Sequence, residues 1–108
     1  CFVVTDGGMH HHLAASGNLG QVIKRSYPVV APARMNETKW APVTIAGPLC
    51  TPLDVLARDI QMPNLKAGDV VAVLQSGAYG ITASPINFLS HDRPTEVIVE
   101  DGQVRVLA

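Results

Sequence analysis

The chain has 108 residues, of which 47% are hydrophobic and 16% are charged, and its formal net charge is −1. This composition favours a single packed domain over disorder, and the lack of a basic stripe excludes nucleic acid as an expected partner. No apolar run approaches the ~18 residues of a membrane span, and no signal peptide opens the chain, so we expect a cytoplasmic protein with reduced cysteines.

We predict short strands separated by turns in the N-terminal half, because prolines and glycines divide its sequence into short apolar runs. Its apolar and β-branched runs predict strands at residues 2–5, 22–23, 28–32 and 43–46. Residues 10–15 favour one helical turn, and residues 35–42 favour a loop. Since the first residues are already strand-like, we expect the chain to be a fragment whose missing part lies on the N-terminal side.

The C-terminal half adds a predicted helix, a strand and a hairpin. Apolar side chains at positions 53, 56 and 60 have helical spacing, so residues 52–60 favour a short helix, with a strand imposed by tertiary contacts as the alternative. Residues 70–74 are apolar on both faces and predict a central strand. Asp101-Gly102 between two alternating runs predicts a β-hairpin. The sum is a mostly β domain with short helical turns, hence a small barrel or a sandwich.

Cys50 is the first candidate for chemistry. It follows the predicted strand 43–46 and the turn-forming pair Gly47-Pro48, where a side chain can be directed into a cleft. A free thiol has a pKa of about 8.5, so it is mostly protonated at neutral pH and can deliver a proton. The alternative is a buried apolar cysteine, which is common in protein cores.

Residues 76–80, Ser-Gly-Ala-Tyr-Gly, form the second candidate. Small residues let the backbone approach a ligand closely, and exposed N–H groups beside the Tyr79 phenol suit a phosphate or carboxylate. The alternative is a strand that ends in a turn, with Tyr79 packed against its neighbours.

The run His10-His11-His12 raises the question of a metal site, since three imidazoles would suit zinc. Adjacent residues rarely point at one ion, however, and the only other histidine, His91, is distant in sequence. We therefore expect no metal here, and instead a polar turn at the mouth of a cleft.

Taken together, the motifs resemble a known family. In chain order they are Asp6-Gly7-Gly8-Met9, Gly47-Pro48-Leu49-Cys50 with Asp54, Gly68-Asp69, Gly77-Ala78-Tyr79-Gly80, Arg93-Pro94 and Glu96-Val97. This series resembles the C-terminal region of the pyridoxal-phosphate-dependent ornithine/diaminopimelate/arginine decarboxylases, which have the alanine-racemase-like fold. The likeness runs from about residue 2 to residue 99.

The resemblance implies a two-domain enzyme. Residues 1–108 would be its C-terminal, Greek-key-like β-barrel, and the missing N-terminal α/β barrel would bind pyridoxal phosphate through a lysine Schiff base. None of Lys24, Lys39 and Lys66 matches that lysine, so the fragment alone should be inactive. Family members are dimers with shared active sites, and their cofactor provides the electron sink.

The resemblance also implies roles for individual residues. Cys50 would reach into the partner subunit's site and protonate the carbanion left when CO₂ departs. Tyr79, with Gly77 and Ala78, would approach the cofactor phosphate. Thr51 would lie at the substrate, and Asp54 would support the interface.

Two departures from the family pattern bear on the substrate. An Arg-Pro-x-x-Tyr segment that grips a substrate carboxylate is replaced, with Ala14, Ala15 and Asn18 at the matching positions, and Thr51 replaces an acidic residue beside the cysteine. A site without these charges should discriminate poorly among free diamino acids. The sequence therefore resembles the subgroup, found in secondary-metabolite or exopolysaccharide (exosortase-system) clusters, that decarboxylates aminoacyl groups held on a carrier protein. One histidine of the triplet could replace the lost arginine as a substrate contact.

Three alternatives stay open. The parent enzyme could decarboxylate free diaminopimelate or ornithine, the chain could be a non-catalytic β-barrel binding module, or it could belong to an amino-acid racemase. Racemases of this fold use a tyrosine base where this chain has Cys50.

Overall fold

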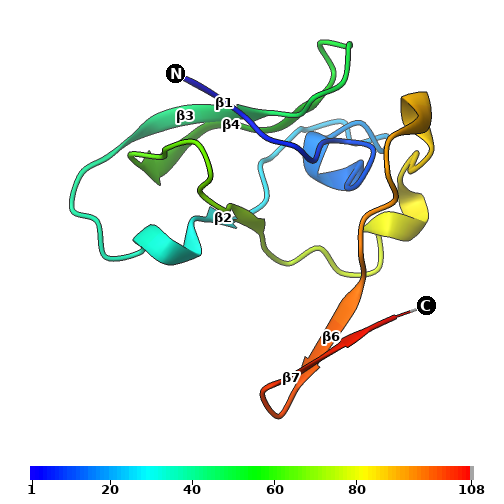
Figure 1. The fold of residues 1–108 in the computed structure, drawn as a ribbon. Coiled ribbons are helices and arrows are strands. Elements are labelled where there is room, and N and C mark those ends of the chain that lie inside the picture. The colour runs from blue at the N-terminus through cyan, green and yellow to red at the C-terminus, as the bar shows by residue number, and fades with distance from the viewer. Residues whose placement is uncertain (108) are drawn as a thin grey trace.

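The computed structural model describes residues 1–107, which form short strands and four single 3₁₀ turns (Figure 1). The strands are β1 (Phe2–Val4), β2 (Val29–Val30), β3 (Trp40–Ala46), β4 (Val55–Pro63), β5 (Ala72–Val73), β6 (Val97–Glu100) and β7 (Gln103–Val106). The 3₁₀ turns are η1 (Ala14–Ser16), η2 (Pro32–Arg34), η3 (Ile81–Ala83) and η4 (Phe88–Ser90). No helix among these residues is long and apolar enough to cross a lipid bilayer.

The largest sheet has the order β1-β3-β4, with β1 parallel to β3 and β3 antiparallel to β4. Between the pairs Val43↔Ile60 and Ile45↔Ala57 the register shifts, and Asp59 takes a positive φ of 49° there. Such a bulge places two residues of β4 opposite one of β3 and bends the strand. The second sheet, β2 with β5, packs Val29 and Val73 against the same core.

The core lies between these two sheets and η1. Its buried apolar members come from β3, β4, η1 and the residue after β2: Ala15, Ala31, Val43, Ile45, Leu56, Ala57 and Met62. Small alanines at three of these positions let the sheets approach closely. The core is therefore made by residues that are distant in sequence.

The predicted helix at residues 52–60 is wrong, and the strand alternative is correct for residues 55–60, which belong to β4. Leu56 and Ala57 are both buried although they are adjacent, a pattern that neither a regular strand nor the helical spacing anticipates. A second register shift, between the pairs Ile45↔Ala57 and Ala46↔Val55, explains it, since it makes Leu56 an extra residue of β4 and turns two neighbouring side chains toward the core. Pairing with β3 outweighs the helical spacing of the apolar residues.

Three further predictions need correction. Residues 22–23 form no strand, and Val22 is 98% exposed. Within residues 70–74 only Ala72–Val73 is strand, paired with β2 alone, so it is not a central strand. The predicted loop at residues 35–42 ends early, because β3 already begins at Trp40.

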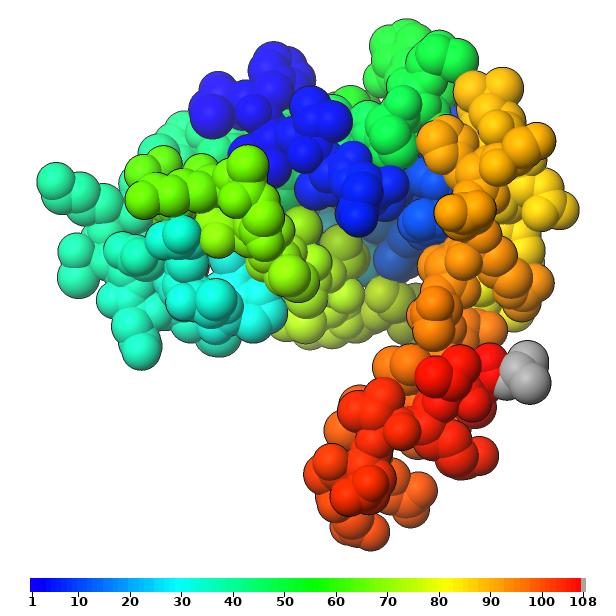
Figure 2. All heavy atoms as spheres, in the orientation of Figure 1, coloured from blue at the N-terminus to red at the C-terminus, as the bar shows by residue number. Residues whose placement is uncertain are grey.

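The predicted hairpin is confirmed as β6 and β7. Asp101 and Gly102 both have positive φ, of 49° and 73°, as a two-residue turn of the twisted hairpin type requires. The hairpin projects away from the rest of the domain (Figure 1; Figure 2, orange to red). The domain is therefore mostly sheet, and residues 1–107 form three separate sheets and no closed barrel.

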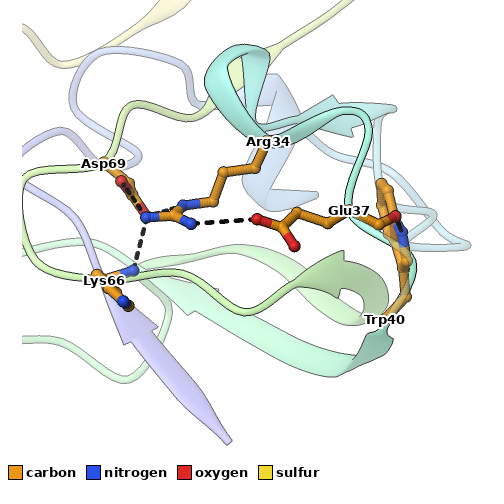
Figure 3. Close-up of polar contacts among 5 residues, drawn as sticks. All are labelled: Arg34, Glu37, Trp40, Lys66 and Asp69. Atoms are coloured by element: carbon orange, nitrogen blue, oxygen red, sulfur yellow. Dashed lines mark hydrogen bonds and ion pairs between the residues drawn. The ribbon is translucent and has the colours of Figure 1, made fainter.

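An ion pair fixes the turn between β4 and β5 (Figure 3). Arg34 donates to Asp69 through Nε at 2.6 Å and through Nη2 at 3.2 Å, and the backbone N–H of Lys66 donates to Asp69 at 2.7 Å. The guanidinium and this N–H hold the pKa of Asp69 below its usual value. Arg34 also pairs with Glu37, whose carbonyl accepts the Trp40 indole N–H.

Candidate functional site

Residues 6–18, the hub segment, are hydrogen-bonded to several of the loops that carry the sequence motifs. Within it, Met9 bonds to Asp54, His12 to Ser76, Leu13 to Ser84 and His11 to the Asp92 carbonyl. The Asn18 amide adds a bond of 2.9 Å to the carbonyl of Leu53. The segment that begins with the first motif therefore joins the turn after β3 to the loops around residues 76–84 and 92.

Asp54 is the buried anchor of the loop that carries Cys50. Asp54 is only 2% exposed. Its Oδ1 accepts the Met9 N–H at 2.7 Å, and its Oδ2 accepts the Leu49 N–H at 2.9 Å. Hydrogen bonds from backbone N–H groups to a buried carboxylate are among the stronger ones in proteins. Asp54 thus joins the hub segment to the turn after β3.

Two glycines make room for this carboxylate. A Cβ at Gly8 would lie 2.6 Å from the Asp54 oxygens, and a Cβ at Gly47 would lie closer still. We call Gly8, Met9, Gly47, Leu49 and Asp54 the Asp54 clamp. It explains why glycines stand in both motifs, and it gives Asp54 a role within the chain; its predicted support of an interface remains a prediction.

Cys50 lies on the exposed turn held by the clamp. Leu49 before it is buried, and Thr51 after it is half-buried, with Oγ1 accepting the Leu53 N–H at 3.3 Å. The buried-cysteine alternative is therefore wrong, and Cys50 and Cys1 are both free and exposed thiols. The turn presents Cys50 outward from a fixed base.

His12 connects the hub segment to the loop at residues 76–80, which we call the Gly-Ala-Tyr loop. The His12 Nδ1 accepts the Ala15 N–H at 3.2 Å, so Nε2 carries the proton and donates to Ser76 Oγ at 2.8 Å. Burial lowers the pKa of His12, which favours this neutral form. The two residues lie 64 positions apart, and no spacing in the sequence pointed to the pair.

The Gly-Ala-Tyr loop leaves its backbone donors free. Among residues 1–107, no group accepts a hydrogen bond from the N–H groups of residues 76–80. Gly77 has a φ of 62°, and a Cβ at Gly77 or Gly80 would meet nothing within 4 Å. Ala78 is exposed and Tyr79 is 65% exposed. The alternative of a packed Tyr79 is wrong for the described chain.

A cavity of about 380 Å³ opens beside this loop, with His11, His12, Ser76, Gly77, Ala78 and Glu96 on its wall. A larger hollow of about 890 Å³ lies between residues 2–8 and the turn at residues 65–71. Neither is lined by Cys50 or by Tyr79. The described chain therefore does not bring the predicted proton donor and the predicted phosphate contact into one pocket.

The histidine triplet divides into two parts. His11 and His12 line both cavities, as a polar turn at a cleft would, whereas His10 is buried at 1% exposure with neither ring nitrogen hydrogen-bonded. Its ring lies 3.8 Å from that of His11 and 4.8 Å from that of His91. Burial and these two imidazoles lower the pKa of His10, against an opposing effect of Asp54. Within residues 1–107 no group of three histidine, cysteine or acidic residues could hold a metal ion.

Comparison with known proteins defines the class. Residues 1–77 match the family described as "Pyridoxal-dependent decarboxylase, C-terminal sheet domain". The chain therefore belongs to the ornithine/diaminopimelate/arginine decarboxylase family, and these residues form its C-terminal sheet domain.

Individual relatives narrow the likeness. The chain is 46% identical over 98% of its length to L-glutamyl-[BtrI acyl-carrier protein] decarboxylase of Niallia circulans, and 33% identical over 98% to diaminopimelate decarboxylase of Bacillus subtilis. It covers 25% and 23% of these two proteins, so it spans about a quarter of the curated relatives it matches. The structure of M. jannaschii diaminopimelate decarboxylase in co-complex with L-lysine matches 97% of the chain, with a TM-score of 0.81 and 27% identity, and 22% of that structure is covered.

Proposed function

We propose that this chain is the C-terminal domain of a pyridoxal-phosphate-dependent decarboxylase that acts on an aminoacyl group carried by an acyl-carrier protein. The observation that carries the substrate class is the neutrality of two positions: Ala14 is 2% exposed inside η1, and Thr51 stands beside Cys50. Neither offers a charge to a free second carboxylate or a distal amine. The 46% identity to a decarboxylase of a carrier-linked glutamyl group supports the same conclusion.

The cofactor would be pyridoxal phosphate, held mainly by an N-terminal α/β barrel outside this chain. The donor-rich Gly-Ala-Tyr loop fits one part of it, since the free N–H groups of residues 76–80 and the Tyr79 phenol are suitable partners for a phosphate. When bound, the cofactor supplies the electron sink for the carbon that loses CO₂. Gly77 and Ala78 would let the backbone approach the phosphate closely.

Cys50 would hold the proton that replaces the departing carboxylate on the substrate carbon. An exposed thiol on a turn anchored by the Asp54 clamp is suited to enter a site made by another polypeptide. We therefore propose a homodimer with shared active sites, in which Thr51 lies beside the substrate and Asp54 fixes the turn. The three sheets would complete a β-barrel with the rest of the polypeptide, and the dimer would be cytoplasmic.

Replacement of the proposed proton donor tests this assignment. In the full-length holoenzyme, Cys50→Ala should slow CO₂ release by about 10²-fold or more, because a positioned acid contributes rates of that order, while the cofactor stays bound. Cys1→Ala, the other exposed free thiol, is the matched control and should leave the rate unchanged. Equal rates for wild type and Cys50→Ala would remove Cys50 from the chemistry.

A substrate panel tests the carrier-linked assignment. We expect CO₂ release from a glutamyl thioester of a carrier protein, and none from free ornithine, lysine, arginine, diaminopimelate or glutamate. The second candidate, a diaminopimelate decarboxylase, is favoured by the 33% identity to the Bacillus subtilis enzyme. CO₂ release from free diaminopimelate would select that candidate. It would mean that residues other than Ala14 and Thr51 determine the substrate specificity.

A further inference from the structure

We propose that Ser76, oriented by His12, donates a hydrogen bond to the acyl carbonyl oxygen that links the amino acid to its carrier. This inference rests on the proposed function and adds a specificity-determining contact to it. The argument depends on the direction of the hydrogen bonds around His12, on the other hydroxyls nearby and on the charge of the 380 Å³ cavity.

The direction of the first two bonds is fixed by the backbone. The Ala15 N–H can only donate, so the His12 Nδ1 that it meets at 3.2 Å must accept. A neutral imidazole then has its proton on Nε2, which donates to Ser76 Oγ at 2.8 Å. Ser76 is thereby the acceptor in this bond, and its own hydroxyl proton is left for another partner.

The neighbouring hydroxyls have no such freedom. Thr82 donates to the Ala78 carbonyl at 2.9 Å. Ser84 donates to the Gly80 carbonyl at 2.7 Å and accepts the Leu13 N–H at 3.0 Å. Ser76 lines the cavity with an uncommitted O–H, and because His12 donates to its oxygen, this O–H is free to donate to an acceptor in the cavity.

The charge of the cavity favours a neutral acceptor. Glu96 is on its wall, and no lysine or arginine side chain lines it; Arg93 is 3.9 Å from Glu96 and lies outside the lining. At Ser76 a free carboxylate would meet Glu96 and no lysine or arginine on the wall, whereas the phosphate proposed above would be bound by the backbone N–H groups of residues 76–80. A thioester or amide carbonyl carries no charge, accepts the Ser76 hydrogen bond and belongs to an acyl arm that a cavity of this volume can admit.

The position of His12 fits this role. It lies two residues before Ala14, at which the family pattern has the arginine that grips a substrate carboxylate. The neutral pair His12 and Ser76 therefore begins two residues before the position at which this chain has Ala14 instead of the family arginine. His12 acts as a positioning residue, since it contacts Ser76 and not the substrate.

The experiment measures kcat and KM of the full-length holoenzyme with a glutamyl thioester of pantetheine, together with the Kd for pyridoxal phosphate. Ser76→Ala should raise KM about fivefold to tenfold, as expected for loss of one neutral hydrogen bond, with kcat and the cofactor Kd unchanged. Ser76→Thr keeps the hydroxyl and should restore the wild-type KM. Ser90→Ala, the same change at an exposed serine outside the cavity, is the matched control and should have the wild-type KM.

The role of His12 is tested by a conservative pair. His12→Gln keeps an N–H donor that can reach Ser76 and should have a near wild-type KM, whereas His12→Leu should raise KM as Ser76→Ala does. A merely structural role would lower the thermal stability of both His12 variants without this difference in KM.

The other outcomes overturn the proposal in distinguishable ways. A weaker cofactor Kd for Ser76→Ala with an unchanged KM would assign Ser76 to the phosphate instead. An unchanged KM and Kd would leave Ser76 without a ligand. If the wild type releases no CO₂ from the thioester, the proposed function fails, and the Ser76 contact fails with it.

Discussion

The turn that carries Cys50 and the Gly-Ala-Tyr loop are both attached to the hub segment. They differ in whether their backbone N–H groups have hydrogen-bond acceptors within the described chain. In the Asp54 clamp, a 2% exposed carboxylate receives two backbone N–H groups, and glycines contact it from both sides. In the Gly-Ala-Tyr loop, five successive backbone N–H groups donate to nothing in the described chain, and its glycines face open space.

The difference shows how one segment supports two kinds of site. A closed, fully hydrogen-bonded turn fixes the position of a reactive side chain, which proton transfer requires. An open loop with free donors keeps its hydrogen bonds for a ligand. The predictions below use matched substitutions in the two loops to test this contrast, from the largest expected effect to the smallest.

Gly47→Ala should have the largest effect on stability. The new Cβ would collide with the Asp54 carboxylate, so the clamp must open or the backbone must shift. Overpacking together with loss of buried hydrogen bonds costs about 3 kcal/mol. Urea unfolding of the full-length protein checks this, and a loss below about 1 kcal/mol would show that the clamp is not rigid.

Asp54→Asn should destabilise by about 2 kcal/mol, because the amide NH₂ would face one of the two backbone N–H donors and leave it unsatisfied. The same change at the exposed hairpin turn, Asp101→Asn, is the control. It should stay within about 0.5 kcal/mol, since Asn-Gly also suits this turn. Equal losses for the two variants in urea unfolding would contradict the clamp.

Gly77→Ala should cost about 1 kcal/mol, the usual penalty for placing an L-residue at positive φ. No atom lies within 4 Å of the new Cβ, so there is no collision of the kind expected at Gly47. Comparison of the two Gly→Ala variants by urea unfolding tests the contrast directly. A loss at Gly77 as large as that at Gly47 would mean that the loop is as closed as the clamp.

Acidification should destabilise the protein at His12, because a proton on Nδ1 removes the acceptor of the Ala15 N–H. The effect should be smaller than that of Gly77→Ala. Burial lowers the pKa of His12 below its ordinary value of 6.5, so the unfolded chain binds more protons than the folded one as pH falls. The contribution is therefore present above pH 6.5 and is lost as pH falls through the folded pKa. His10 has the same sign.

Unfolding measured at steps between pH 8 and pH 5 checks this dependence. His12→Gln cannot titrate and should flatten part of the curve, with the contribution of His10 left. A curve identical to that of the wild type would show that His12 does not contribute.

The sequence by itself determined the features that depend on local chemistry and on motif order. Asp101-Gly102 specified its hairpin, because both residues tolerate positive φ. The turn after Ala46 followed from the Gly47-Pro48 break, whereas the exposure of Cys50 was decided by the structure. The series of motifs also indicated the family to which the chain belongs.

Only the tertiary structure decided how distant segments satisfy one another. The helical spacing at residues 52–60 gave way to β4, since pairing with β3 and the register shift at Leu56 bury Leu56 and Ala57 together. Asp54 became the buried centre of two glycine motifs, and His12 met Ser76 across 64 positions. Hydrogen bonds and packing between distant residues depend on the folded path of the chain, which neither periodicity nor local propensity encodes.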